Sequence, residues 1–183
     1  HLLVDVPQAV SARQAIELWE SDFWQTREPE EMAGKYDLPL IEPADLRPGP
    51  LSYPRWDTTR VGYLAWLIEA YLTLPADGRI CIMGPTDIIA ALIWGLTHAL
   101  PEQLTAGLTF ATYTDDVASS PARIVGTTAQ GEERDGADLP APGPRVPTRN
   151  LNLFNGRASS AGESDPFSGW SRAYAAYAAA HLG

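Results

Sequence analysis

One segment constrains the fold of this chain more than any other: a short apolar strand followed at once by an apolar helix. Residues 79–83 (Arg-Ile-Cys-Ile-Met) are apolar on both faces, which is typical of a strand inside a covered sheet. Gly84, Pro85, Thr86 and Asp87 then turn the chain into a helix over roughly 87–99, which is apolar almost all round. The segment therefore predicts a sheet with helices packed against it.

The elements on either side of this segment extend the pattern. Apolar residues at helical spacing predict a helix that follows Asp57 or Thr58. Alternation predicts a strand over 108–113, and residues 123–128 are its expected hairpin partner across the polar loop 114–122. Residues 151–154 are a possible further strand, and 170–182 a helix. The order predicts an α/β or α+β domain with a mixed sheet.

The N-terminal third is predicted to belong to a separate domain. Residues 2–6 are an expected strand, and Ser11 with Gln14 is the pattern of a capping box that opens a helix. Residues 25–57 contain six prolines and form an expected linker. We therefore expect residues 1–50 to be the end of an N-terminal domain plus linker, and 51–183 a middle domain with a flexible loop at 129–149. Because the chain starts at His1 with an apolar run, we expect it to be cut from a longer protein.

Composition excludes several classes of function. The formal net charge is −10, which offers no electrostatic surface for nucleic acid or an anionic membrane. No apolar run is long enough to span a bilayer. A single cysteine, Cys81, excludes an internal disulfide, and three scattered histidines give no metal site. We therefore predict no metal and no cofactor, and a core position for Cys81.

Two places are candidates for a ligand site. The first is the junction between strand and helix at Gly84, Thr86 and Asp87, because the free amides of a helix N-terminus attract anions. Asp87 already places a negative charge there, however, and structural capping is the simpler interpretation. The second is the polar pair Thr112 and Tyr113 at a strand end. No catalytic motif accompanies either place, so nothing in the sequence indicates an enzyme.

Trp19, Phe23 and Trp24 are the candidate partner-binding residues. They belong to the first predicted helix or follow it directly, just before the proline-rich linker. Large aromatic side chains on one helix face commonly pack into a core, but here they are also candidates for contact with a neighbouring domain or a partner protein.

Two stretches resemble a known family. The first comprises residues 1–5 and 15–24, and the second 100–104, 108–113 and 123–126. Together they resemble the bacterial GTPase-associated protein family, the first the end of its N-terminal domain and the second its middle domain. The resemblance implies a non-catalytic component that works beside GTPases in signalling or defence. It also implies that GTP belongs to the partner, since this chain lacks a phosphate-binding loop.

The leading hypothesis is a non-catalytic adaptor or scaffold in a GTPase-linked bacterial system, with protein partners that include a GTPase module. The alternative is a small-ligand sensor or enzyme that uses a pocket near Gly84–Asp87 and Thr112–Tyr113. A purely structural subunit of a large assembly is a third interpretation.

The composition also indicates a source and a location. Lys35 is the only lysine, and alanine, proline and glycine are frequent, so we expect a GC-rich bacterial source. The single reduced cysteine, Cys81, fits a cytoplasmic location.

Overall fold

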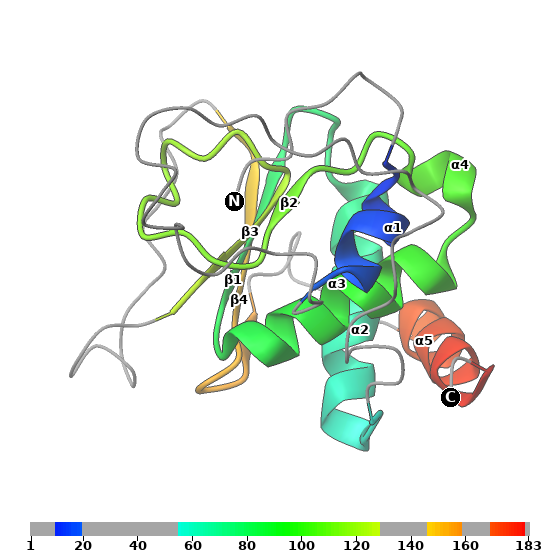
Figure 1. Ribbon diagram of the computed structural model, residues 1–183. Coiled ribbons are helices and arrows are strands. Elements are labelled where there is room, and N and C mark those ends of the chain that lie inside the picture. The colour runs from blue at the N-terminus through cyan, green and yellow to red at the C-terminus, as the bar shows by residue number, and fades with distance from the viewer. Residues whose placement is uncertain (1–9, 20–54, 129–145, 159–168, 182–183) are drawn as a thin grey trace, which may run out of the picture.

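The computed structural model describes residues 10–19, 55–128, 146–158 and 169–181, and Figure 1 shows how its helices gather on one side of the sheet. The helices are α1 (Ala12–Glu17), α2 (Thr58–Thr73), α3 (Thr86–Ala99), α4 (Glu102–Thr105) and α5 (Gly169–His181). The strands are β1 (Arg79–Met83), β2 (Phe110–Ala111), β3 (Ile124–Thr127), β4 (Thr148–Asn152) and β5 (Arg157–Ala158).

The strands form one mixed sheet in the order β2-β3-β1-β4-β5. β1 pairs in parallel with β3 on one side and with β4 on the other, while β5 runs antiparallel to β4 at the edge. The sequence predicted an α/β chain with a mixed sheet and β1 in its interior, and both predictions are confirmed. The central position explains why every residue from Ile80 to Met83 is buried.

The two faces of the sheet are covered differently. Ile80, Ile82, Ile124 and Leu151 point to the helices and join them in the larger hydrophobic core. Since side chains alternate along a strand, Cys81, Met83 and Val125 point the other way. A smaller cluster forms on that second face, where Val117 and Ala122 from the segment between β2 and β3 supply the cover.

Local signals start the first two helices as the sequence indicates. Asp57 caps α2 by accepting a hydrogen bond from the amide of Arg60 at 2.8 Å. The Ser11 hydroxyl accepts from the Gln14 amide at 3.2 Å, and the Gln14 side chain accepts from the Ser11 amide at 2.9 Å. This reciprocal pair is the predicted capping box.

Helix α3 lies at the centre of the molecule. Nine consecutive residues, 89–97, are buried, as its apolar sequence predicted. Gly95 lets Trp56 approach, because a Cβ at this position would overlap the indole ring. The ring of Trp56 therefore packs directly on the α3 backbone, at the start of the segment that leads into α2.

The predicted hairpin is wrong. β2 and β3 are neighbours, but they run parallel, with Phe110 opposite Ile124 and Ala111 opposite Val125. The polar loop 114–122 was expected to join the two strands of a hairpin; instead it carries Val117 across the second face of the sheet and returns the chain to the start of β3. Arg79 holds this path, since its guanidinium donates to the carbonyls of Val117, Ala118 and Ser120.

Several element boundaries also differ from the predictions. β2 covers only residues 110–111 of the expected 108–113, and β4 begins at Thr148, inside the loop expected at 129–149. Backbone pairing with β1 from Arg79 onward places Thr148 in the sheet despite its polar neighbours. The predicted strand at 2–6, most of the linker and the loop residues 129–145 lie outside the described residues.

Candidate functional site

Gly84, the first predicted ligand-site residue, lies where β1 ends. Its amide donates to the Thr127 carbonyl at 2.9 Å, which joins it to β3. A Cβ on Gly84 would lie 2.8 Å from the Cβ of Leu153, so that side chain occupies the space beside the glycine. Leu153 is fixed there, because its own amide donates to the Met83 carbonyl at 2.8 Å. The absence of a side chain at Gly84 is therefore explained by packing.

Thr86 and Asp87 form the first turn of α3. The N-cap residue is Pro85, and no side chain makes a capping hydrogen bond. The expectation that a side chain of this junction caps α3 is therefore wrong; Pro85 instead supplies the extended backbone geometry that an N-cap needs. Asp87 is exposed, and its carboxylate lies at the positive end of the helix dipole, where it disfavours a second anion.

Thr112 and Tyr113 directly follow β2. β3 lies between β2 and β1, so one strand separates this pair from Gly84. The backbone there is tightly packed: the Thr114 amide donates to the Gly126 carbonyl at 2.9 Å, and a Cβ on Gly126 would overlap the Thr112 carbonyl. The Tyr113 side chain is 49% exposed. The two predicted halves of the ligand site are thus at the same end of the sheet but not adjacent.

Of the three candidate partner-binding residues, the structure describes one. Trp19 follows α1, is partly buried and packs against the main hydrophobic core. Phe23 and Trp24 lie outside the described residues, so their role stays a prediction.

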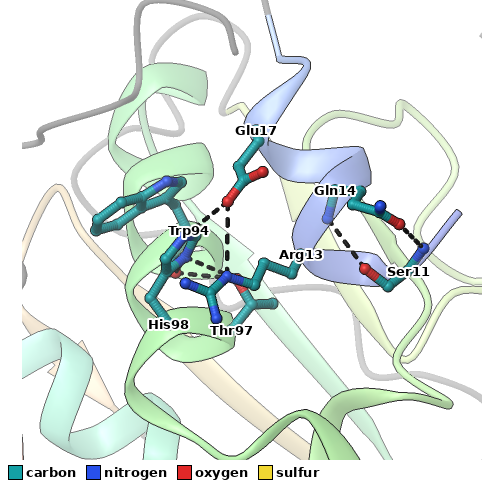
Figure 2. A network of polar contacts seen from close by, with 7 residues as sticks. All are labelled: Ser11, Arg13, Gln14, Glu17, Trp94, Thr97 and His98. Carbon is teal, nitrogen blue, oxygen red and sulfur yellow. Dashed lines mark hydrogen bonds and ion pairs between the residues drawn. The ribbon is translucent and has the colours of Figure 1, made fainter. Parts of the chain in front are cut away.

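A polar network joins α1 to α3, and Figure 2 shows its members. The imidazole of His98 lies between two acceptors, with Nε2 2.9 Å from a carboxylate oxygen of Glu17 and Nδ1 2.8 Å from the Trp94 carbonyl. Its ring stacks on the Trp94 indole with centroids 3.9 Å apart. Arg13 lies 3.6 Å from the same Glu17 oxygen. Burial is the main cause that lowers the pKa of His98 below its usual value.

This network contains the residue types of a catalytic triad, but its hydroxyl group is not accessible to a substrate. The Thr97 hydroxyl lies 3.3 Å from His98 Nδ1, and Glu17 lies on the other side of the ring. Thr97 is 1% exposed, however, and its hydroxyl already donates to the Trp94 carbonyl at 3.0 Å. A substrate has no path to that oxygen, so the network works as a link between α1 and α3. No sequence pattern indicates this network, because Glu17 and His98 are 81 positions apart.

Cys81 is fully buried in β1, and desolvation raises the pKa of its thiol to about 11. This agrees with the core position expected for it. Among the described residues, no group of three or more His, Cys, Asp or Glu side chains is arranged to hold a metal ion.

Among the residues that the structure describes, the two most exposed aromatic side chains lie on α5. The side chains on its inner side are small: Ser171, Ala175 and Ala178 are buried against the helices beneath. Its outer side carries Trp170 and Tyr177, which are 51% and 63% exposed. We call Trp170, Ala173, Ala176, Tyr177 and Ala180 the outer face of α5; all five are exposed. The seven-residue spacing of Trp170 and Tyr177 was visible in the sequence, but only the packing shows that the alanine side is the buried one.

Helix α5 is fixed in place by contacts to two other helices. The Ser171 hydroxyl donates to the Glu69 carboxylate on α2 at 2.8 Å, and the Tyr174 hydroxyl donates to the Ala99 carbonyl at the end of α3 at 2.5 Å. The ring of Tyr177 lies 4.1 Å from that of His181. The outer aromatic side chains are therefore presented on a helix with a defined orientation.

These features define an α/β protein whose central helix is buried and whose last helix exposes aromatic side chains. Residues 55–143 match the family described as GTPase-associated protein 1, middle domain. The resemblance to GTPase-associated proteins is confirmed for this part of the chain, which contains α2, β1, α3, α4, β2 and β3. The match fits a GTPase-linked system with a GTPase-related partner.

No curated protein and no solved structure matches the chain significantly. Of the helices in the described ranges, none has both the length and the apolarity that crossing a bilayer requires. The division of the chain into residues 1–50, as the end of an N-terminal domain plus linker, and residues 51–183, as a middle domain, remains a prediction.

Proposed function

We propose that this chain is a non-catalytic adaptor or scaffold of a GTPase-linked bacterial signalling or defence system, and that the outer face of α5 binds the GTPase module. The observation that carries the proposal is the exposure of Trp170 and Tyr177 on a helix that is otherwise well packed. Exposed aromatic side chains on a rigid element are the residue types that dominate protein–protein binding energy.

Charge supports a protein partner at this face. The chain carries a net charge of −10, but the sequence of α5 contains no Asp or Glu, and its ionisable residues are Arg172, Tyr174, Tyr177 and His181. If the partner's binding surface has an acidic rim, α5 itself contributes no carboxylate that would repel it. The alanines between the aromatic side chains leave room for a partner's backbone to approach closely.

The family match supports the identity of the partner. The matched family is described as GTPase-associated. Helix α5 packs on α2 and α3, which both belong to the matched segment. A docking helix on this body would place a GTPase beside the middle domain. The chain itself would contribute contact and positioning, with GTP bound by the partner.

The test is a capture experiment with the full chain. Wild-type protein is immobilised and exposed to extract from its native host, and each captured protein is identified and assayed for GTP hydrolysis. We expect the wild type to capture a GTP-hydrolysing protein, and the double variant Trp170→Ala/Tyr177→Ala to lose it. The matched control is Leu72→Ala/Leu104→Ala, which removes two side chains that are 42% and 50% exposed on α2 and α4. Equal capture by both double variants, or no GTPase among the captured proteins, contradicts the proposal.

A further inference from the structure

A cleft opens at the end of the sheet opposite to Gly84, where β1 and β3 begin. Its volume is about 430 Å³, and Tyr71, Asp77, Arg79, Thr109 and Arg123 contribute to its walls. Arg79 is the first residue of β1, and Arg123 directly precedes β3. Because β1 and β3 are parallel neighbours, the backbones of the two arginines lie side by side at this edge, and both residues line the cleft.

Arg79 is held by neutral acceptors. Its Nη1 donates to the carbonyls of Val117 and Ala118 at 2.7 and 3.0 Å, and its Nη2 donates to the Ser120 carbonyl at 2.5 Å. Carbonyl oxygens fix the position of a guanidinium but leave its full positive charge in place. The charge of Arg79 is therefore oriented without being neutralised.

Arg123 is held in the same way and keeps an unused donor. Its Nη2 donates to the carbonyls of Tyr71 and Leu74 at 3.1 and 3.2 Å, and its guanidinium carbon lies 4.5 Å from the centroid of the Tyr71 ring. Its Nε is buried and has no hydrogen-bond acceptor. Because Nε has almost no accessible surface, direct contact with a ligand in the cleft would come from the Nη groups, and the unpaired Nε–H serves as a reporter of the charge placed beside the guanidinium.

The charge balance of the cleft favours an anion. Within the described part of the chain, no carboxylate lies within 4.0 Å of either guanidinium. Asp77 is the one acidic residue among those lining the cleft, and it lies on the exposed turn at the rim. Two arginines against one aspartate leave the cleft net positive on a chain whose total charge is −10. Thr109 also lines the cleft, and its hydroxyl oxygen accepts from the Arg123 amide at 3.0 Å.

We propose that this cleft binds a small oxyanion, a phosphoryl or carboxylate group, with the guanidiniums of Arg79 and Arg123 as its main contacts. Planar guanidiniums suit such groups because they offer several donors in fixed directions. The site is distinct from the outer face of α5 and from the positions near Gly84, and it stands whether or not α5 binds a GTPase.

The test follows the side-chain Nε–H signals of arginine by NMR in the 15N-labelled full chain. Inorganic phosphate and succinate are titrated separately, each against sodium chloride of equal ionic strength. We expect a saturable shift of the Arg123 Nε–H signal, with a Kd of about 1 mM or tighter for at least one anion. The anion that saturates it identifies the group as phosphoryl or carboxylate. Shifts no larger than those with chloride for both anions would overturn the proposal.

A charge variant at the rim tests the location without touching the arginines. Asp77→Asn removes the competing carboxylate and is expected to tighten binding about two- to threefold, the effect of one unit charge across about 6–8 Å of water. Asp87→Asn, an exposed residue on α3 beyond the opposite end of β1, is the matched control and is expected to leave Kd unchanged. Equal effects of the two variants would place the anion outside the cleft. Arg123→Lys, checked for folding by circular dichroism, is expected to weaken binding about fivefold or more, since it removes the planar fork of guanidinium donors.

Discussion

Replacing Trp94 by alanine tests whether α3 is the centre of the hydrophobic core. Trp94 is 5% exposed and lies among the buried residues of α3. A tryptophan buries about 150–250 Å² of surface, which at about 25 cal/mol per Å² corresponds to about 4–6 kcal/mol as an upper estimate. Measured large-to-small changes of this kind cost about 3–5 kcal/mol. We expect Trp94→Ala to lower the free energy of unfolding by about 3–5 kcal/mol.

The contact with His98 is part of this loss. The two rings stack with centroids 3.9 Å apart, so the alanine variant leaves the imidazole beside a cavity. The bond from His98 Nδ1 to residue 94 remains, because its acceptor is the backbone carbonyl. With a typical domain stability of about 5–15 kcal/mol, the variant is expected to be weakly folded or partly unfolded at room temperature.

The assay is urea unfolding followed by far-ultraviolet circular dichroism, because a chain with six tryptophans gives a composite fluorescence signal. Trp170→Ala is the matched control: this tryptophan is 51% exposed, and its removal should change stability by about 0.5 kcal/mol or less. A Trp94→Ala variant that unfolds within about 1 kcal/mol of wild type would refute the placement of Trp94 in the core.

Two further predictions concern titratable groups. The pKa of His98 is lower in the folded chain than the ordinary value of 6.5, so the unfolded chain binds the proton more readily; stability should fall as pH drops below about 6.5, by at most about 1.4 kcal/mol per pH unit. Urea unfolding at pH 7.5 and 5.5 checks this prediction. The free energy of unfolding should differ less between the two pH values in His98→Asn than in wild type; an equal difference would show that other groups cause the pH dependence. With the pKa of Cys81 raised to about 11, a thiol reagent at pH 8 should label the chain only after unfolding. Rapid labelling of the native chain would contradict its burial.

The sequence was most informative where one physical signal dominated. The strand 79–83 and the helix that follows were predicted almost to the residue. A continuous run of apolar residues has to be buried, which leaves few structures other than an interior strand or a covered helix. Ser11 and Gln14 form the expected capping box because its geometry is local.

Errors arose where long-range contacts decide the structure. Alternation within 108–113 is compatible with either strand direction. The parallel pairing of β2 and β3 depends on the path of the segment between them, in which Val117 is buried and its carbonyl accepts from the Arg79 side chain. The pair of Glu17 and His98 is likewise invisible in sequence, since it depends on α1 packing against α3. The same holds for the cleft around Arg123, whose walls come from four separate segments.

The outer face of α5 shows a different limit. Its aromatic spacing was visible, but a helix with alanine on one side and aromatic residues on the other has two possible orientations. Aromatic residues usually face the core, but here only Tyr174 of the three in α5 packs against it. Trp170 and Tyr177 lie outside, since Ser171, Ala175 and Ala178 occupy the buried side, where Ser171 bonds Glu69 and the small side chains allow close approach to α2.

The most direct test of the proposed role is the dissociation constant between the full chain and the GTPase that it captures, measured by calorimetry for wild type and for Trp170→Ala. If Trp170 is a central contact of the interface, its loss costs about 2 kcal/mol, so Kd should rise about 30-fold while the melting temperature stays near that of wild type. An unchanged Kd in a folded Trp170→Ala variant would show that the partner binds elsewhere and that α5 is not the docking surface.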